Sequence, residues 1–91
     1  MEKLSAIEIQ SKLQETNGWF LECGELTKQF KFKSFTKAIS FVAEVAFIAE
    51  KLNHHPQIKI EYNKVQLTVS THDVEGITQK DFNLIIEIDK L

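Results

Sequence analysis

Cysteine and proline are nearly absent from this chain, which contains one of each among its 91 residues. With a single cysteine, Cys23, the chain cannot form an internal disulfide or a zinc site built on several cysteines. We therefore expect a reducing compartment, the cytoplasm. We expect Cys23 itself to be a small buried apolar residue rather than a catalytic thiol.

A net excess of either charge is also missing. The 11 basic and 13 acidic residues give a formal net charge of −2. Such a balance provides no electrostatic attraction for the phosphates of nucleic acids, so we expect no direct nucleic-acid contact. It does not exclude a protein partner that itself binds DNA.

The sequence has no uncharged apolar run of the length that a membrane span requires. Its most apolar segment, residues 35–52, contains four charged residues, Lys37, Glu44, Glu50 and Lys51, so we expect no membrane contact. The first five residues show no basic segment followed by an apolar one, and no signal peptide is expected.

What is present is the composition of a small globular protein. The hydrophobic fraction of 43% and the charged fraction of 26% are ordinary for soluble domains. A chain of 91 residues is expected to form one domain, residues 1–91, with a core small enough for self-association to supplement it.

Capping residues and apolar periodicity predict three helices, at about residues 5–15, 35–52 and 78–90. Ser5 and Glu8 form a capping box for the first, and Ser34 caps the second. The apolar stripe of residues 35–52 is wider than a surface helix needs, so this helix is expected to lie on a sheet and to contact another element too. It must end before Pro56, because the residue that precedes a proline is pushed out of the helical region.

Alternating segments predict two β-hairpins, formed by residues 19–23 with 26–32 and by residues 58–62 with 65–70. A Gly24-Glu25 turn would join the first pair and set Cys23 against Leu26. An Asn63-Lys64 turn would join the second pair, so that opposed residue numbers sum to 127 and Ile60 faces Leu67. Residues 71–76 are expected to form a loop.

The predicted elements follow one another in the order α-β-β-α-β-β-α. The simplest architecture is α+β, a four-stranded antiparallel sheet with three helices packed on one face. The opposite face of the sheet would then be more polar and open.

The three histidines of the chain lie around the second hairpin. Continuing its register outward sets His55 against His72 on the polar side, where opposed Cβ atoms are roughly 4.5–5.5 Å apart. His54 lies in the bend after the long helix, and its direction is not determined by this argument. The site is therefore expected where that helix ends and the hairpin opens.

Three interpretations of the histidines stay open: a solvated or packed cluster, a metal site, and a site of acid-base chemistry. A metal is disfavoured because adjacent side chains of a strand point apart and because Asp73 and Asp81 are the only acidic residues close by. Histidine can give and take a proton near neutral pH. No nucleophilic serine or cysteine motif accompanies it, so a proton-transfer reaction such as dehydration fits best.

The spacing of these residues resembles that of a known family. The motif Glu50-x-x-x-His54-His55-Pro56, followed by Tyr62, His72 and Asp81, is similar to the pterin-4a-carbinolamine dehydratase family. The tracts at residues 62–65, 70–73 and 76–82 resemble the family as well, and the chain length and element order agree with it. The chain departs from many members in having Ile58 where they have a tryptophan two residues after the proline.

The resemblance implies dehydration of 4a-hydroxytetrahydropterin to quinonoid dihydropterin, which recycles the cofactor of aromatic amino acid hydroxylases. It implies no metal and no organic cofactor. The implied catalytic residues are His54, His55 and His72, and the implied substrate-binding or orienting residues are Asp81, Pro56 and Thr71. Asp81 also follows Thr78 by three positions, so it is expected to cap the last helix as well as to orient a histidine.

Within that scheme we expect His54 and His72 to do most of the proton transfer and His55 to orient the pterin. The resemblance also implies a homodimer or homotetramer. An alternative from the same family is a protein-binding module, because some members are dimerisation cofactors of a homeodomain transcription factor and others resemble carboxysome or Rubisco assembly factors.

Overall fold

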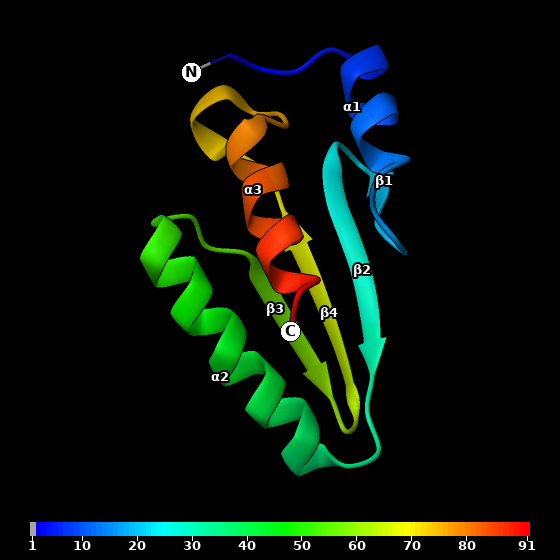
Figure 1. Ribbon diagram of the computed structural model, residues 1–91, viewed down its shortest axis with the longest axis vertical. Coiled ribbons are helices and arrows are strands. Elements are labelled where there is room, and N and C mark those ends of the chain that lie inside the picture. The colour runs from blue at the N-terminus through cyan, green and yellow to red at the C-terminus, as the bar shows by residue number, and fades with distance from the viewer. Residues whose placement is uncertain (1) are drawn as a thin grey trace.

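The computed structural model describes residues 2–91 and confirms the predicted fold class, α+β with the order α-β-β-α-β-β-α (Figure 1). The elements are α1 (Ala6–Leu13), β1 (Phe20–Glu22), β2 (Glu25–Lys31), α2 (Phe35–Leu52), β3 (Gln57–Glu61), β4 (Lys64–Val69), a short 3-10 helix η1 (His72–Val74) and α3 (Gln79–Ile88). The four strands form one antiparallel sheet in the spatial order β1-β2-β4-β3. The hairpins therefore meet through β2 and β4 in the centre, and β1 and β3 are the edges.

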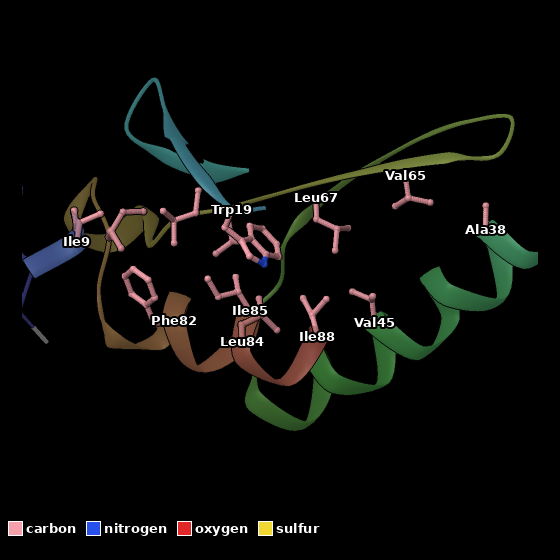
Figure 2. Close-up of a cluster of buried hydrophobic side chains, with 13 residues drawn as sticks. Ile9, Trp19, Ala38, Val45, Val65, Leu67, Phe82, Leu84, Ile85 and Ile88 are labelled. Atoms are coloured by element: carbon pink, nitrogen blue, oxygen red, sulfur yellow. The ribbon is translucent and has the colours of Figure 1, made fainter. Parts of the chain in front are cut away.

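The core lies between the sheet and the helices on one of its faces (Figure 2). Strand β4 alternates, so that Val65, Leu67 and Val69 are buried and the residues between them face the other side. The helices contribute the buried apolar side chains of Ile9, Ala38, Val45, Phe82, Leu84, Ile85 and Ile88. The opposite face of the sheet carries mostly polar side chains, as predicted.

The helix starts agree with the predicted caps. The Ser5 hydroxyl accepts from the backbone N–H of Glu8, and the Glu8 carboxylate accepts from the backbone N–H of Ser5 at 2.8 Å. That backbone hydrogen bond lowers the pKa of Glu8 from its ordinary value. Ser34 caps α2 through the N–H of Lys37. Because these signals are local, the sequence was sufficient to locate them.

Helix α2 ends at Leu52 because the next residue, Asn53, adopts a left-handed conformation, before Pro56 is reached. Asn53 takes a φ of 51°, a conformation that asparagine tolerates at a helix C-terminus. The following backbone N–H, that of His54, donates to the carbonyl of Ala49 at 3.0 Å. This hydrogen bond holds His54 against the last turn of the helix.

None of the helices among residues 2–91 is long and apolar enough to cross a membrane.

The predicted turn of the first hairpin was wrong by one residue. The chain turns at Cys23-Gly24, so that Leu21 pairs with Leu26 and Glu22 with Glu25. Both turn residues have positive φ, 51° and 77°, which is the geometry of the type I′ turn that suits the twist of a hairpin. Cys23 is consequently exposed at the turn, and the expectation of a buried cysteine was also wrong.

The second hairpin also turns one residue earlier than predicted, at Tyr62-Asn63. Ile60 pairs with Val65 and Ile58 with Leu67, so opposed numbers sum to 125. The turn is held by Asn63, whose side-chain amide donates to the carbonyl of Phe32 at 2.8 Å. A shift of two in the sum leaves every side chain on its predicted face, because side chains alternate with a period of two.

Candidate active site

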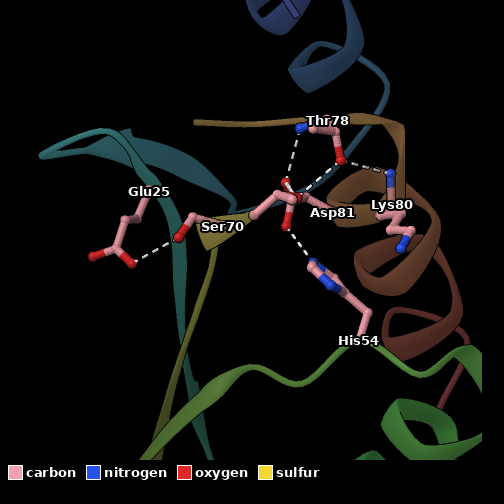
Figure 3. A network of polar contacts seen from close by, with 7 residues as sticks. Glu25, His54, Ser70, Thr78, Lys80 and Asp81 are labelled. Carbon is pink, nitrogen blue, oxygen red and sulfur yellow. Dashed lines mark hydrogen bonds and ion pairs between the residues drawn. The ribbon is translucent and has the colours of Figure 1, made fainter. Parts of the chain in front are cut away.

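His54 points from the end of α2 towards α3 and contacts Asp81 (Figure 3). Its Nε2 lies 2.6 Å from Oδ1 of Asp81. The Asp81 side chain is completely buried, and the His54 side chain is 13% exposed. One edge of this imidazole is therefore held inside the protein, and the ring still reaches solvent.

A buried group of hydroxyl and backbone donors holds the other oxygen of Asp81. Oδ2 accepts from the backbone N–H of Thr78 and from Oγ1 of Thr71, both at 2.8 Å. Thr78 and Asp81 together form the capping box of α3, as predicted. A buried carboxylate is tolerated only where its oxygens are hydrogen-bonded, and here both oxygens have partners.

The contact with Asp81 occupies one ring nitrogen of His54 and holds the direction of the ring. An ionised carboxylate can only accept hydrogen bonds, so towards such an Asp81 the Nε2 of His54 would be the donor. Nδ1 of His54 has no hydrogen-bond partner among the described residues. A carboxylate that fixes the tautomer and direction of an imidazole is a recurrent device in general acid-base sites.

His55 lies at the open face of the sheet, where it lines a cavity with Gln57, Thr68 and Ser70. Its Nε2 is hydrogen-bonded to a carboxylate oxygen of Glu50 on the last turn of α2. The two side chains are 57% and 76% exposed, so this contact is a solvated one and contributes little to stability. His54 and His55 thus face different surroundings, as neighbouring residues of an extended segment do.

His72 is the first residue of η1, just beyond the end of β4. The loop that carries it is closed at its base, because the backbone N–H of Thr71 donates to the carbonyl of Gly76 at 2.8 Å. His72 lines the same cavity as His55, a hollow of about 400 Å³ on the open face. The lining of that cavity is Glu25, His55, Pro56, Gln57, Thr68, Ser70 and His72.

An adjoining hollow of about 320 Å³ is lined by all three histidines. The structure therefore brings the three histidines together, although His55 and His72 do not form the cross-strand pair that we expected. With the observed register, His55 would extend the ladder opposite Ser70. His72 approaches it from the loop beyond the strand. Of the other motif residues, Tyr62 lies in the turn of the second hairpin and lines neither hollow. Another hollow, of about 430 Å³ beside Phe41 and Leu91, contains no histidine.

Sequence reasoning missed Glu25 and Ser70. Glu25 is the first residue of β2, and its carboxylate accepts a hydrogen bond of 3.0 Å from the Ser70 hydroxyl (Figure 3). The two residues are 45 positions apart, and they meet because β2 pairs with β4. No local sequence pattern predicts such a contact, because it depends on which strands of the two hairpins are neighbours in the sheet.

Ile58, which stands where many members of the family have a tryptophan, packs against the core.

Among residues 2–91, no group of three or more histidine, cysteine, aspartate or glutamate side chains is arranged to hold a metal ion. Two acidic groups that contact histidines are engaged within the protein, whereas Asp73 lines the hollow of the three histidines without a hydrogen-bond partner among the described residues. Asp81 is held by Thr71, Thr78 and His54, and Glu50 by His55. The arrangement is suited to moving protons between a ligand and imidazole rings.

Comparison with known proteins points to the same family that the motif spacing resembles. The family model described as pterin 4 alpha carbinolamine dehydratase matches residues 2–91. A relative from Roseiflexus sp. (strain RS-1), provisionally named a pterin-4-alpha-carbinolamine dehydratase, is 46% identical over 89 residues, which cover 98% of this chain and 96% of the relative. A relative from Sinorhizobium medicae (strain WSM419) with the same provisional name is 47% identical over 91 residues, covering 98% and 87%.

Two solved structures are similar in fold. A crystal structure of a transcriptional coactivator/pterin dehydratase from Brucella melitensis has a TM-score of 0.93 at 34% identity, covering 98% of this chain and 97% of that one. A pterin dehydratase-like protein, described as a RuBisCO assembly factor in the alpha-carboxysome, has a TM-score of 0.65 at 20% identity, covering 79% and 83%. The second likeness concerns the fold alone. From the family model and the full-length relatives, this chain belongs to the pterin-4-alpha-carbinolamine dehydratase family.

Proposed function

We propose that residues 1–91 act as a single dehydratase domain that converts 4a-hydroxytetrahydropterin to quinonoid dihydropterin and water. The observation that carries this proposal is the set of three histidines around one hollow, with His54 held by the buried Asp81. Family membership supplies the substrate class. The reaction would recycle the pterin cofactor of aromatic amino acid hydroxylases, in the cytoplasm.

The reaction needs two proton transfers. The C4a–O bond breaks as the departing hydroxyl takes up a proton, and a double bond forms between C4a and the ring nitrogen that gives up its proton. All three histidines line the hollow, and histidine exchanges protons at neutral pH. We assign these transfers to His54, which Asp81 holds in place, and to His72, whereas His55 is already hydrogen-bonded to Glu50. This scheme requires neither a metal nor an organic cofactor.

The remaining residues would bind or orient. We propose that His55 and Pro56, which line the larger cavity, contact the pterin. Asp81 and Thr71 are positioning residues in this scheme, because they act through the imidazole of His54. Their hydrogen bonds keep Nε2 of His54 occupied, so that Nδ1 is the atom available to the substrate.

His72→Ala is expected to lower kcat by about 100-fold, the low end of the range for a lost general acid or base. The side chain is exposed, so its removal leaves no buried group unsatisfied and the thermal midpoint should hardly change. Stopped-flow turnover of chemically generated carbinolamine measures the effect. Gln79→Ala, an exposed residue outside both hollows, is the control.

Unchanged turnover in His72→Ala would refute the acid-base assignment. Metal analysis of the purified wild-type protein gives an independent check. A stoichiometric bound ion would contradict the proposed cofactor-free chemistry.

A second candidate function is a protein-binding module, and the surface of α2 favours it. Phe35, Ile39 and Phe47 lie on α2 and are 50%, 41% and 76% exposed, and exposed apolar groups of this kind are typical of interaction surfaces. The similar protein from Brucella is described as a transcriptional coactivator as well as a pterin dehydratase. A wild-type protein without turnover that binds a protein partner would support this candidate over the dehydratase.

We also propose that the chain forms a homodimer or homotetramer, with the same three residues of α2 in the contact. Phe47→Glu is expected to shift the molar mass to a smaller species, because a charge would be buried without a partner in the interface. Light scattering after size-exclusion chromatography measures the mass. Glu44→Gln, on the same helix, should leave it unchanged, and an unaltered mass for Phe47→Glu would exclude α2 from the contact.

A further inference from the structure

Glu25 lies outside the histidine motif, and the pairing of strands in the sheet brings it to the candidate site. It begins β2, and β2 pairs with β4 so that Leu26 is opposite Val69. Continuing that register brings Glu25 beside Ser70, whose hydroxyl donates to the carboxylate at 3.0 Å. Both residues line the cavity of about 400 Å³ that His55 and His72 also line.

Glu25 is half-buried, and few groups within the protein balance the charge of its carboxylate. Among residues 2–91, no lysine or histidine nitrogen lies within ion-pair distance of it. The hydroxyl of Ser70 is its only hydrogen-bond donor in the described chain, and it contacts Oε2. Oε1 is left free to accept from a ligand, and a partly desolvated carboxylate gains most from donors that a ligand supplies.

The chemistry of a pterin provides such donors. The N3–H and the 2-amino group lie side by side on the pyrimidine ring and point in the same direction. A carboxylate can accept both at once, as it does from the parallel N–H groups of a guanidinium. A cavity of about 400 Å³ is within the usual size of small-molecule sites.

We propose that Glu25 is a specificity-determining residue that binds the N3–H and 2-amino edge of the pterin. This inference rests on the proposed pterin substrate. C2, which carries the amino group, lies across the six-membered ring from C4a. A carboxylate on one wall and histidines on another would therefore direct the reacting carbon towards the histidines.

The test compares two ligands that differ at one group. In 7,8-dihydropterin position 2 carries an amino donor, whereas in 7,8-dihydrolumazine it carries a carbonyl acceptor. The wild-type protein should bind the dihydropterin about 10- to 100-fold more tightly, the range for a hydrogen bond to a charged group. Glu25→Gln should reduce that preference to a few-fold, because the amide offers one acceptor and one donor.

Fluorescence or calorimetric titration gives the four dissociation constants. Glu22→Gln is the matched control, because Glu22 is the cross-strand partner of Glu25, is exposed and does not line the cavity. Loss of the preference in Glu25→Gln but not in Glu22→Gln supports the inference, even if the wild type turns over no carbinolamine. A lost preference together with an inactive wild type would contradict the proposed reaction but not the proposed binding role of Glu25.

A preference that survives in Glu25→Gln overturns the inference, even if the wild type is an active dehydratase. An equal loss of affinity for both ligands also overturns it, since it would mean that Glu25 acts on the charge of the histidines rather than on the amino edge. Failure of the wild type to bind either ligand would overturn the inference and the proposed function together.

Discussion

His54→Gln is expected to lower kcat for carbinolamine dehydration by about 100- to 1,000-fold while the protein stays folded. General acid-base groups contribute factors of this size. Glutamine can still donate a hydrogen bond to the buried Asp81, so the carboxylate keeps a partner, but an amide cannot exchange a proton near neutral pH. Turnover and thermal unfolding of the same preparation separate the chemical effect from any loss of structure.

His55→Gln is the matched control for this prediction. The residue is adjacent in sequence and of the same type, but its partner is the exposed Glu50 rather than Asp81. We expect His55→Gln to raise KM more than it lowers kcat. Equal effects of the two substitutions on kcat would contradict the special role that the contact with Asp81 gives to His54.

Asp81→Ala is expected to lower the free energy of unfolding by about 3 kcal/mol. The substitution removes the capping-box acid of α3, and helix caps contribute about 0.5–2 kcal/mol. It also leaves the backbone N–H of Thr78 and the hydroxyl of Thr71 without their buried acceptor, and an unsatisfied buried group costs about 1–3 kcal/mol. For a domain of this size the thermal midpoint should fall by more than roughly 10 °C.

The capping box of α1 provides a control for that prediction. Glu8 occupies the same capping-box position in α1, but in full contact with solvent, so Glu8→Ala should lower the thermal midpoint much less. Asp81→Asn should regain part of the stability, because an amide oxygen still accepts from Thr78, yet kcat should stay low. A midpoint for Asp81→Ala no lower than that of Glu8→Ala would show that the buried network contributes little.

Local signals in the sequence predicted the elements well. The capping boxes at Ser5 and Thr78 and the start of α2 were found correctly, because each depends on residues within one helical turn. The faces of the strands were also predicted correctly, since apolar residues alternate along them with a period of two. The motif spacing was sufficient to name His54, His55, His72 and Asp81 before any geometry was known.

Turn geometry was predicted less well. Both hairpins turn one residue earlier than expected, at Cys23-Gly24 and Tyr62-Asn63. Cys23 and Tyr62 adopt positive φ there, a conformation that few residues other than glycine and asparagine take readily. The preference of Gly24 for such a conformation was visible in the sequence, but its position within the turn was not.

The sequence by itself determined the fold class and the capped helices, because apolar periodicity and caps depend on neighbours within a few positions. The histidines were singled out by the spacing of a motif that extends from Glu50 to Asp81, and their roles stay a prediction. The sequence predicted that Asp81 orients a histidine, and only the tertiary structure decided that this histidine is His54, 27 residues away. Only the structure showed that Glu25 contacts Ser70, 45 residues away. The contact of Glu25 with Ser70 requires the central pairing of β2 with β4, and the contact of His54 with Asp81 requires the packing of α3 beside the end of α2. The physical reason is that burial of the apolar faces selects this arrangement, and the polar contacts of the site follow from where the backbones then lie.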